Sequence, residues 1–300
     1  MTDTTALVPD CAPPNPNPST PKLALPPGSC DSHCHVVGPF DRFMPPPDRS
    51  YTPAEAPETE LRRLHDRLRI DRAVIVQSQG HGMDHAPLLD ALKTGARRYR
   101  GVCLLTPASS DALIERFDAA GVRGVRFNFM RHLGGHLEPD AMREVVAKVK
   151  PHGWHVSVHV AGLDVVEHSE LIRSLDAPVV IDHMARPALE DGPDGAAVSE
   201  VRRLIDTGKV WVKLSGAERL SKAGAPYHDV VPIARSLAAY APERVLWATD
   251  WPHVNLKNPM PDDADLVDLI EAVVPSEAAR HRLLVDNPAE FFGFPSVQGQ

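Results

Sequence analysis

Short apolar runs alternate with amphipathic segments along most of the chain. Each run is rich in Val, Ile, Leu and other apolar residues and ends in polar ones, a pattern typical of buried β-strands. Between the runs, apolar residues recur at every third or fourth position, which is typical of helices that pack on one face. The pattern predicts strands at 30–36, 71–78, 99–106, 122–129, 155–160, 178–184, 210–216 and 244–250.

Helical periodicity fills the intervals between these strands and continues past the last one. The predicted helices cover 58–69, 84–95, 110–120, 139–150, 164–175, 198–207, 229–240, 263–273 and 276–285. Apolar strands that alternate with amphipathic helices indicate a parallel sheet covered by helices. Eight such units in about 250 residues match a (β/α)8 TIM barrel, with a doubly wound open sheet as the alternative. Because no glycine-rich dinucleotide or P-loop motif follows a strand, we predict an α/β fold of the barrel type.

Prolines set the start of the chain apart. Proline removes a backbone donor and interrupts helices and sheets, so we predict an extended or disordered tail over 1–29 and the barrel over 30–300. The prolines of this tail are Pro9, Pro13, Pro14, Pro16, Pro18, Pro21, Pro26 and Pro27. A second proline-rich stretch, 39–57, follows the first strand and contains Tyr51. A loop of this length in a compact domain is typical of functional loops or lids.

Composition narrows the class of protein. A chain of 300 residues with 43% hydrophobic and 24% charged residues is typical of a folded globular protein of one large domain or two ordinary ones. The formal net charge of −8 argues against nucleic-acid binding, because contacts with phosphates need a basic surface. The four cysteines form no C-x-x-C pair, and the sequence has neither a signal-peptide pattern nor a membrane-length apolar run. We therefore predict a cytoplasmic protein that binds neither nucleic acid nor membranes; the oligomeric state stays open.

Histidine is frequent, at 15 residues, and several histidines stand at strand ends. In a (β/α)8 barrel the reactive groups come from the carboxyl ends of different strands. Because strand residues alternate between two faces, His33 and His35 point the same way. Together with His159, His183 and Asp250 they suit a zinc-like divalent ion that keeps an open position for water. A single histidine at such a place is more often a hydrogen-bonded polar residue, but the convergence of ligands from four strands favours a metal site.

A second set of polar residues is cationic. Arg126 and Asn128 share one face at the end of the fourth strand, Arg186 follows His183 by three residues, and Arg219 lies just past the seventh strand. A guanidinium group matches a carboxylate or sulfonate in a bidentate way, so these residues favour a site for a small anion. Each arginine alone is more often a solvated surface residue. Further candidates in segments that follow strands are Tyr51, Ser78, His81, Arg131, His132 and His253.

The order of these motifs resembles the amidohydrolase superfamily of the amidohydrolase-2 type. Within it, the chain is similar to the branch of lactone hydrolases that act on 2-pyrone-4,6-dicarboxylate or 4-sulfomuconolactone. An H-x-H motif alone is a weak signal, but IDHMARP and ATDWPH in this order make the resemblance specific. The segments that carry it are DSHCHVVGP (31–39), DRSYTPAEAP (48–57), GVRGVRFNF (121–129), GWHV (153–156), VVIDHMARP (179–187), VWVKLSGAERL (210–220), YHDVVPIAR (227–235), RVLWATDWPHVNLKNPMPDD (244–263) and LLVDNP (283–288).

The resemblance implies a role for each matching residue. Asp250 would be the general base that takes a proton from the attacking water. His33, His35 and His183 would polarise the lactone carbonyl, directly or through a metal, and Tyr51 matches a tyrosine of the active-site loop. The arginines that match substrate-binding positions are Arg126, Arg186 and Arg219. Ester hydrolysis needs this combination of a base near water and an electrophile where negative charge develops.

Two positions depart from the pyrone-dicarboxylate hydrolase pattern. His159 stands where that enzyme has a tyrosine, and His132, next to Arg131, stands where it has an arginine. The resembled enzyme is understood to work without a metal, which leaves a metal-free mechanism open. A histidine on the fifth strand restores the ligand set of metal-binding relatives, so we predict one bound divalent ion, zinc. Its predicted ligands are His33, His35, His159, His183 and Asp250.

These features predict a lactonase that hydrolyses the ester bond of a small polyanionic lactone from bacterial aromatic catabolism. The exchanged arginine favours a muconolactone such as 4-sulfomuconolactone over the alternative substrate, 2-pyrone-4,6-dicarboxylate. A metal-dependent decarboxylase and a lactone isomerase of the same superfamily are further alternatives. The non-enzymatic alternative is an anion-binding barrel that has lost catalysis, which the intact base and H-x-H pair oppose. The predicted substrate contacts are Tyr51, Ser78, Arg126, Asn128, His132, Arg186, Arg219 and His253.

Overall fold

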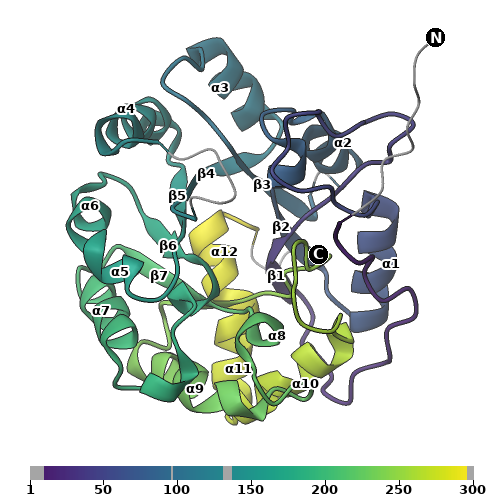
Figure 1. Ribbon diagram of the computed structural model, residues 1–300, viewed down its shortest axis with the longest axis vertical. Coiled ribbons are helices and arrows are strands. Elements are labelled where there is room, and N and C mark those ends of the chain that lie inside the picture. The colour runs from purple at the N-terminus through teal and green to yellow at the C-terminus, as the bar shows by residue number, and fades with distance from the viewer. Residues whose placement is uncertain (1–9, 96, 131–136, 296–300) are drawn as a thin grey trace.

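The computed structural model describes residues 10–95, 97–130 and 137–295. In these ranges the strands form one sheet of eight parallel strands, which follow one another in sequence order. The strands are β1 (Cys30–Cys34), β2 (Arg72–Val76), β3 (Tyr99–Cys103), β4 (Val122–Asn128), β5 (His155–His159), β6 (Val179–Ile181), β7 (Val210–Leu214) and β8 (Val245–Trp247). Helices surround the strands, and the predicted (β/α)8 barrel is confirmed (Figure 1).

Every predicted helix is present with small shifts at its ends, and short helices at 217–220 and 287–292 were not predicted. They are α1 (Glu58–Leu68), α2 (Ala86–Thr94), α3 (Asp111–Ala119), α4 (Pro139–Val149), α5 (Asp164–Glu167), α6 (Ser169–Ser174), α7 (Ala196–Ile205), α8 (Ala217–Leu220), α9 (Val231–Tyr240), α10 (Asp263–Val273), α11 (Glu277–His281) and α12 (Asn287–Phe292). The helix predicted over 164–175 is two helices, because His168 between them has non-helical angles of φ −96° and ψ 5°. The helix predicted over 276–285 continues from α11 through a π-helical turn into α12. None of the helices in the described ranges has the length and apolar character needed to cross a membrane.

The barrel closes where the segment after β8 meets β1. The Asp250 amide donates a hydrogen bond to the His33 carbonyl oxygen at 2.9 Å. One step along, the His35 amide donates to the Trp251 carbonyl oxygen at 2.7 Å. The seam of the barrel therefore runs through the H-x-H pair and the predicted base.

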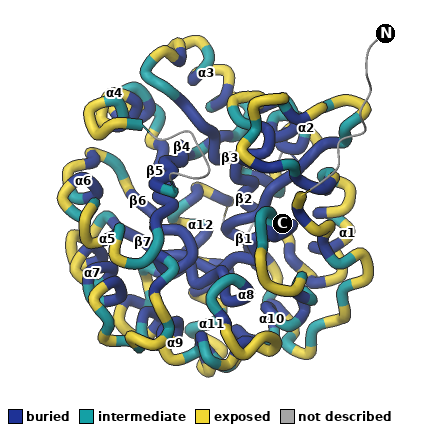
Figure 2. The backbone as a smooth tube through the Cα atoms, viewed as in Figure 1, coloured by how far each residue is buried: buried dark blue, intermediate teal, exposed yellow. Residues whose placement is uncertain are grey.

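Two apolar layers support the strands. The outer layer lies between the strands and the helices, and the inner layer fills the interior of the barrel. Successive strand residues divide between them: Ile75 belongs to the outer layer, whereas Val74 and Val76 belong to the inner one. Figure 2 shows this buried centre in dark blue, with exposed positions on the outer turns of the helices. The inner layer also contains Val102, Val180, Trp211, Leu246, Phe292 and Phe294.

The described part of the proline-rich tail contains neither helix nor strand. It is attached to the barrel: the Lys22 and Leu23 amides donate to the Asp268 carboxylate at 2.7 and 2.9 Å, and Leu25 is buried in the outer layer. Of the two predicted forms, extended or disordered, residues 10–29 thus adopt the extended one. The remainder of the predicted tail lies outside the described residues.

Asn287 ties α12 to the start of β8, and its loss should destabilise the fold. Its buried amide donates to the carbonyl oxygens of Pro242 and Val245 at 2.9 and 2.8 Å. Asn287→Leu keeps the size but leaves two carbonyls unpaired, so we expect the free energy of unfolding to fall by about 2–4 kcal/mol in urea titrations. Asn17→Leu, at an exposed position, is the control and should change it by less than about 0.5 kcal/mol. Equal stability of Asn287→Leu and the parent chain would contradict this role.

Candidate active site

A cavity of about 170 Å³ opens at the carboxyl ends of the strands. Because all the parallel strands end at this rim, residues far apart in the sequence meet there. The cavity is lined by His35, Tyr51, Gln79, Arg126, His159, His183, Arg186, Arg219, Asp250, Val254, Asn255 and Lys257. Most of the residues predicted from the sequence are therefore in one place.

Three imidazole nitrogens face one oxygen of Asp250. The Nε2 atoms of His33, His35 and His183 lie 3.6, 3.5 and 3.7 Å from Oδ1. The second oxygen, Oδ2, accepts a hydrogen bond from Nε of Arg219 at 2.5 Å. The carboxylate thus has one oxygen fixed by an arginine and one turned toward the histidines.

Two of these imidazoles are anchored through their other nitrogen. His35 Nδ1 donates to the Val76 carbonyl oxygen at 2.8 Å, so this nitrogen carries the proton and Nε2 keeps a free lone pair in the neutral ring. His183 Nδ1 lies 2.9 Å from the Ser215 hydroxyl. Such contacts on the far side of a ring hold it in the orientation that a ligand to a metal ion needs.

The third imidazole, His33, rests on a buried layer of charges. Its Nδ1 lies 3.3 Å from Asp182 Oδ1 and 2.9 Å from Lys213 Nζ. Asp182 also pairs with Lys213 at 2.9 Å and accepts from Arg126 Nε and the Ser157 hydroxyl at 3.0 and 2.9 Å. Burial opposes the charge of Asp182, but Lys213 and its other neighbours outweigh burial and hold the pKa of this carboxyl well below its usual range. This layer separates the apolar interior from the cavity.

Burial sets the charge state of the site. It lowers the pKa of His33 to about 3 and holds the pKa values of His159 and His183 well below the usual value. These rings are therefore neutral at neutral pH. Burial also opposes ionisation of Asp250, but the charge of Arg219 and the neighbouring histidines outweigh it and hold the pKa of that carboxyl well below its usual range. The site combines an ionised Asp250 with neutral His33, His159 and His183.

Residues His183 to Arg186 form a left-handed turn. Their φ angles are 52°, 56°, 59° and 45°, a region that costs a non-glycine residue roughly 1–2 kcal/mol. The turn is held by the Gly162 amide, which donates to the Ala185 carbonyl oxygen at 2.7 Å. Because of the turn, His183 and Arg186 reach the same cavity. Backbone strain of this kind is typical of functional sites.

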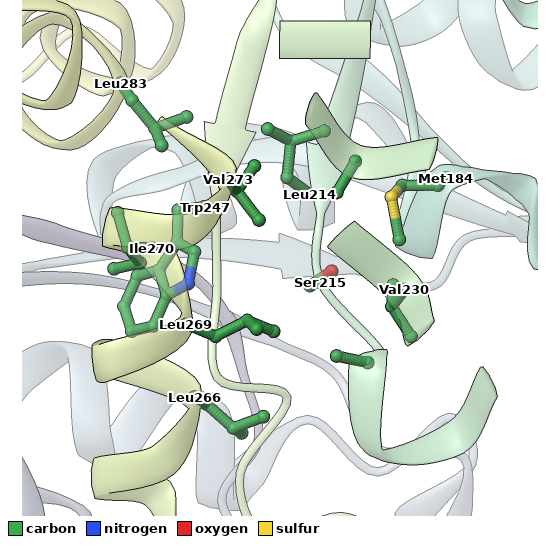
Figure 3. Close-up of a pocket in the computed structure, with 12 residues that line it drawn as sticks. Met184, Leu214, Ser215, Val230, Trp247, Leu266, Leu269, Ile270, Val273 and Leu283 are labelled. Carbon is green, nitrogen blue, oxygen red and sulfur yellow. The ribbon is translucent and has the colours of Figure 1, made fainter. Parts of the chain in front are cut away.

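An apolar pocket behind this turn holds Met184. In Figure 3, Met184 and Val230 lie on one side of the pocket and the apolar side chains of α10 on the other. Its volume of about 30 Å³ corresponds to roughly one water molecule, so it has no room for a substrate. Ser215, which contacts His183, also lines it. The pocket therefore supports the site from behind, and the chemistry belongs to the polar cavity.

The three arginines of the cavity differ in what already binds them. Arg219 is tied to Asp250, and Arg126 to Asp182. Arg186 has a buried Nε without a hydrogen-bond partner among the described residues. Burial, with the nearby charge of Arg219, lowers the pKa of Arg186 to about 10. Arg186 is thus the arginine with a free, buried donor for an anion.

Other predicted residues lie beside the cavity. The Ser78 hydroxyl is 3.2 Å from the Tyr51 hydroxyl and reaches the cavity only through it. The Asn128 side-chain oxygen accepts a hydrogen bond from the backbone amide two residues on, at 3.0 Å. His132 and its neighbour Arg131 lie outside the described residues.

The structure corrects the predicted place of His253. Its ring is buried, with Nε2 3.1 Å from Asp263 and Nδ1 3.6 Å from Glu218, and it does not line the cavity. The positive φ of 58° at His253 turns the chain in a way that a strand-like extension past Asp250 does not anticipate. Burial alone would lower its pKa, but the two carboxylates outweigh burial and raise the pKa of His253 to about 10. His253 is the centre of a buried ion pair.

Sequence reasoning missed both lining and supporting residues. Gln79, Asn255 and Lys257 line the cavity from loops whose conformation leaves no clear signal in the sequence. Asp182 and Lys213 did leave a signal in the sequence, since each is a charged residue within an otherwise apolar strand run. A charge at a buried strand position needs a partner, and these two residues are each other's partners.

Two groups of described residues are compact enough to hold a metal ion: Asp31, Cys34 and His65, and His33, His183 and Asp250. In the first group, Asp31 already accepts from His65 at 3.2 Å and from Thr249. In the second, His33 Nε2 is buried without a hydrogen-bond partner. Its nitrogen–oxygen separations of 3.6 and 3.7 Å are close to the roughly 3.4 Å between tetrahedral ligands with bonds of about 2.1 Å. The second group therefore fits a divalent ion.

His159 stands next to this group. Its ring centre is 5.8 Å from that of His183. Both of its nitrogens are buried and have no hydrogen-bond partner among the described residues. A neutral imidazole with two free nitrogens at the cavity wall is available to a metal ion or a substrate.

Comparison with known proteins gives consistent matches over nearly the whole chain. A family model described as amidohydrolase matches residues 30–294. A 2-pyrone-4,6-dicarboxylate hydrolase of Comamonas testosteroni is 40% identical over 285 residues, which cover 92% of this chain and 93% of that protein. A 4-sulfomuconolactone hydrolase of Rhizobium radiobacter is 36% identical over 291 residues, which cover 96% and 97%. An apo crystal structure from Agrobacterium tumefaciens is 31% identical, with a TM-score of 0.82 and coverage of 92% of this chain and 100% of that one.

His253 should make the stability of the fold depend on pH. Its pKa is about 10 in the folded protein and about 6.5 in an unfolded chain. The charged ring therefore stabilises the fold fully below about pH 6.5, and this contribution is lost as the pH rises through the folded pKa. His253→Gln removes it, so the difference in unfolding free energy between parent and variant should shrink between about pH 7 and about pH 9.5.

Denaturant unfolding at several pH values measures this difference. His281→Gln is the matched control, because His281 pairs with Asp286 at the exposed surface, where ion pairs contribute little. Its difference from the parent chain should be small and constant. A constant difference for His253→Gln as well would contradict the buried ion pair.

Proposed function

Because the chain belongs to the amidohydrolase family, we propose that it is a lactonase that hydrolyses the ester bond of a small polyanionic lactone. One observation carries the proposal: an ionised Asp250 with one oxygen facing three imidazole nitrogens, in a cavity lined by arginines. The relatives named as hydrolases of 2-pyrone-4,6-dicarboxylate and 4-sulfomuconolactone support the reaction class.

Asp250 is the proposed general base. Arg219 holds Oδ2, so Oδ1 is the oxygen that takes a proton from water at the cavity. A carboxylate whose pKa is held low is a weak base, and ordinary water is a very weak acid. Proton removal therefore needs a second group that makes the water more acidic.

We propose that a zinc ion, held by His33, His35, His183 and Asp250 with His159 beside them, is that group. When bound, it would acidify the attacking water and stabilise the charge that develops on the lactone oxygen. The neutral state of His33, His159 and His183 favours this, because only the unprotonated imidazole nitrogen binds a metal. The alternative is a metal-free mechanism, in which the imidazoles themselves polarise the carbonyl.

The cations of the cavity select the substrate. Arg186 has an unpaired buried donor, and Lys257 stands at the exposed edge. An acid group on the lactone ring would bind there, leaving the ester carbonyl at the histidines. We propose 4-sulfomuconolactone first, because His159 departs from the pyrone-dicarboxylate hydrolase pattern, and 2-pyrone-4,6-dicarboxylate second.

Asp250→Asn should abolish hydrolysis. The change keeps the shape of the side chain but removes the base, so we expect the rate of hydrolysis to fall by roughly a thousand-fold. The rate is measured with each of the two lactones as acid release in a pH-stat. Asp265→Asn, on the outward part of α10, is the control and should keep the parent rate. Retained hydrolysis in a folded Asp250→Asn variant would contradict the role of Asp250 as the general base. Carbon dioxide release, or product formation without acid release, would instead indicate a decarboxylase or an isomerase.

Metal content tests the ion separately from activity. Protein purified without chelator should contain about one equivalent of zinc by elemental analysis, as a single mononuclear site requires. His183→Ala removes one ligand and should lower the bound zinc well below that, whereas His281→Ala, at the surface, should not. Fully active protein without metal would overturn the zinc proposal and leave the metal-free mechanism.

A further inference from the structure

The proline-rich segment before β1 has no role in the proposed chemistry, yet it is bonded to a loop of the cavity. The amides of Asp10 and Cys11 donate to the Thr52 carbonyl oxygen at 3.0 and 3.3 Å. In return, the Thr52 amide donates to the Asp10 carboxylate at 2.8 Å. Thr52 follows Tyr51, whose side chain lines the cavity. The start of the described tail is thus attached to the loop that carries Tyr51.

Cys11 reaches a second cavity loop, the one that follows β8. Its buried sulfur accepts a hydrogen bond from the Asn255 amide at 3.2 Å. Asn255 has a φ of 56°, a left-handed conformation that needs support from its surroundings. Asn255 and Lys257 both line the cavity. Within the described chain, no direct hydrogen bond joins the loop 39–57 to the loop 251–262, so residues 10 and 11 are the polar link between them.

The link is itself held in place. After Pro13, Pro14, Pro16 and Pro18, the tail is anchored at the end of the loop 251–262, just before α10: the Ser19 amide donates to both carboxylate oxygens of Asp262 at 3.0 Å. Proline fixes its own φ and restricts the residue before it, so this stretch loses little conformational freedom when it is docked. A stiff segment fastened at both ends can transmit a fixed position to the loops it touches.

We propose that Asp10 and Cys11 form a clasp that positions the two cavity loops, and with them Tyr51, Asn255 and Lys257, around the substrate. The proposal rests on the proposed function in one respect, that the substrate occupies this cavity. Asp250, His33 and His35 are held by the seam of the barrel, and His183 by the turn after β6, so these groups do not depend on the clasp. Asp10 and Cys11 are therefore positioning residues, which act on substrate binding through the loops.

Kinetics separate this role from a direct one in the reaction. Cys11→Val keeps a buried apolar side chain but removes the acceptor for Asn255, and Asp10→Ala removes the acceptor for Thr52. Each should raise KM for the lactone roughly three- to ten-fold, the effect of about one hydrogen bond, with kcat within about two-fold of the parent. Cys11→Ser keeps an acceptor and should restore KM. Asp268→Ala loosens the tail at Lys22 and Leu23, away from the cavity, and should leave KM unchanged.

Amide hydrogen exchange tests the clasp without any substrate. The Thr52 amide donates to Asp10 and the Asn255 amide to Cys11, so Thr52 should exchange roughly ten-fold faster in Asp10→Ala and Asn255 roughly ten-fold faster in Cys11→Val, while the amides of β8 keep their protection. Unchanged exchange at Thr52 and Asn255 would overturn the proposal. Faster exchange throughout the barrel would also overturn it, because it would show a general loss of stability. If the parent chain hydrolysed no lactone, the proposed function would fail, and exchange would still decide the clasp.

Discussion

Two backbone hydrogen bonds at the seam of the barrel determine where the reactive groups lie. They join His33 and His35 of β1 to Asp250 and Trp251 after β8. The bonds that close the barrel therefore also set the distance between the H-x-H pair and the carboxylate. A constellation built on strand ends is held more precisely than one built on loops, which accounts for two imidazoles that meet one oxygen at 3.5 and 3.6 Å.

The interior becomes more polar from the inner apolar layer toward the mouth, and each step has an energetic consequence. Burying Asp182 and Lys213 is unfavourable unless each compensates the other, and their pairing at 2.9 Å does so while it fixes the His33 ring. The left-handed turn that begins at His183 adds strain, which the burial of Met184 and Ala185 in the outer apolar layer offsets. The two apolar layers thus supply the stability that a strained, charged site needs.

Periodicity was sufficient to predict the strands and most helices, and with them the ligand set at the strand ends. His33, His35 and Asp250 were predictable because a parallel barrel brings strand ends together whatever the loops do. His253 and Lys257 were not, because their places depend on backbone turns such as the positive φ values of 58° and 56° at His253 and Asn255. Nothing in the residue types of that loop dictates those angles. The buried ion pair of Lys213 could have been predicted, because a lysine inside the apolar run VWVKLSG needs a buried acid as its partner.

The whole chain is negatively charged, whereas its cavity is lined by cations. Salt screening allows an anionic substrate to approach the cavity despite the net negative charge. The net charge of −8 repels an anionic substrate only at low ionic strength, since the Debye length is about 8 Å under physiological conditions. Within that distance of the cavity mouth, the nearby cations determine the electrostatic potential that a substrate meets. Arg126 and Arg219 already donate hydrogen bonds to Asp182 and Asp250, so they act mainly by orienting these carboxylates. The donors available to an incoming acid group are therefore on Arg186 and Lys257, which is why a cavity with several arginines need not bind an equal number of acid groups.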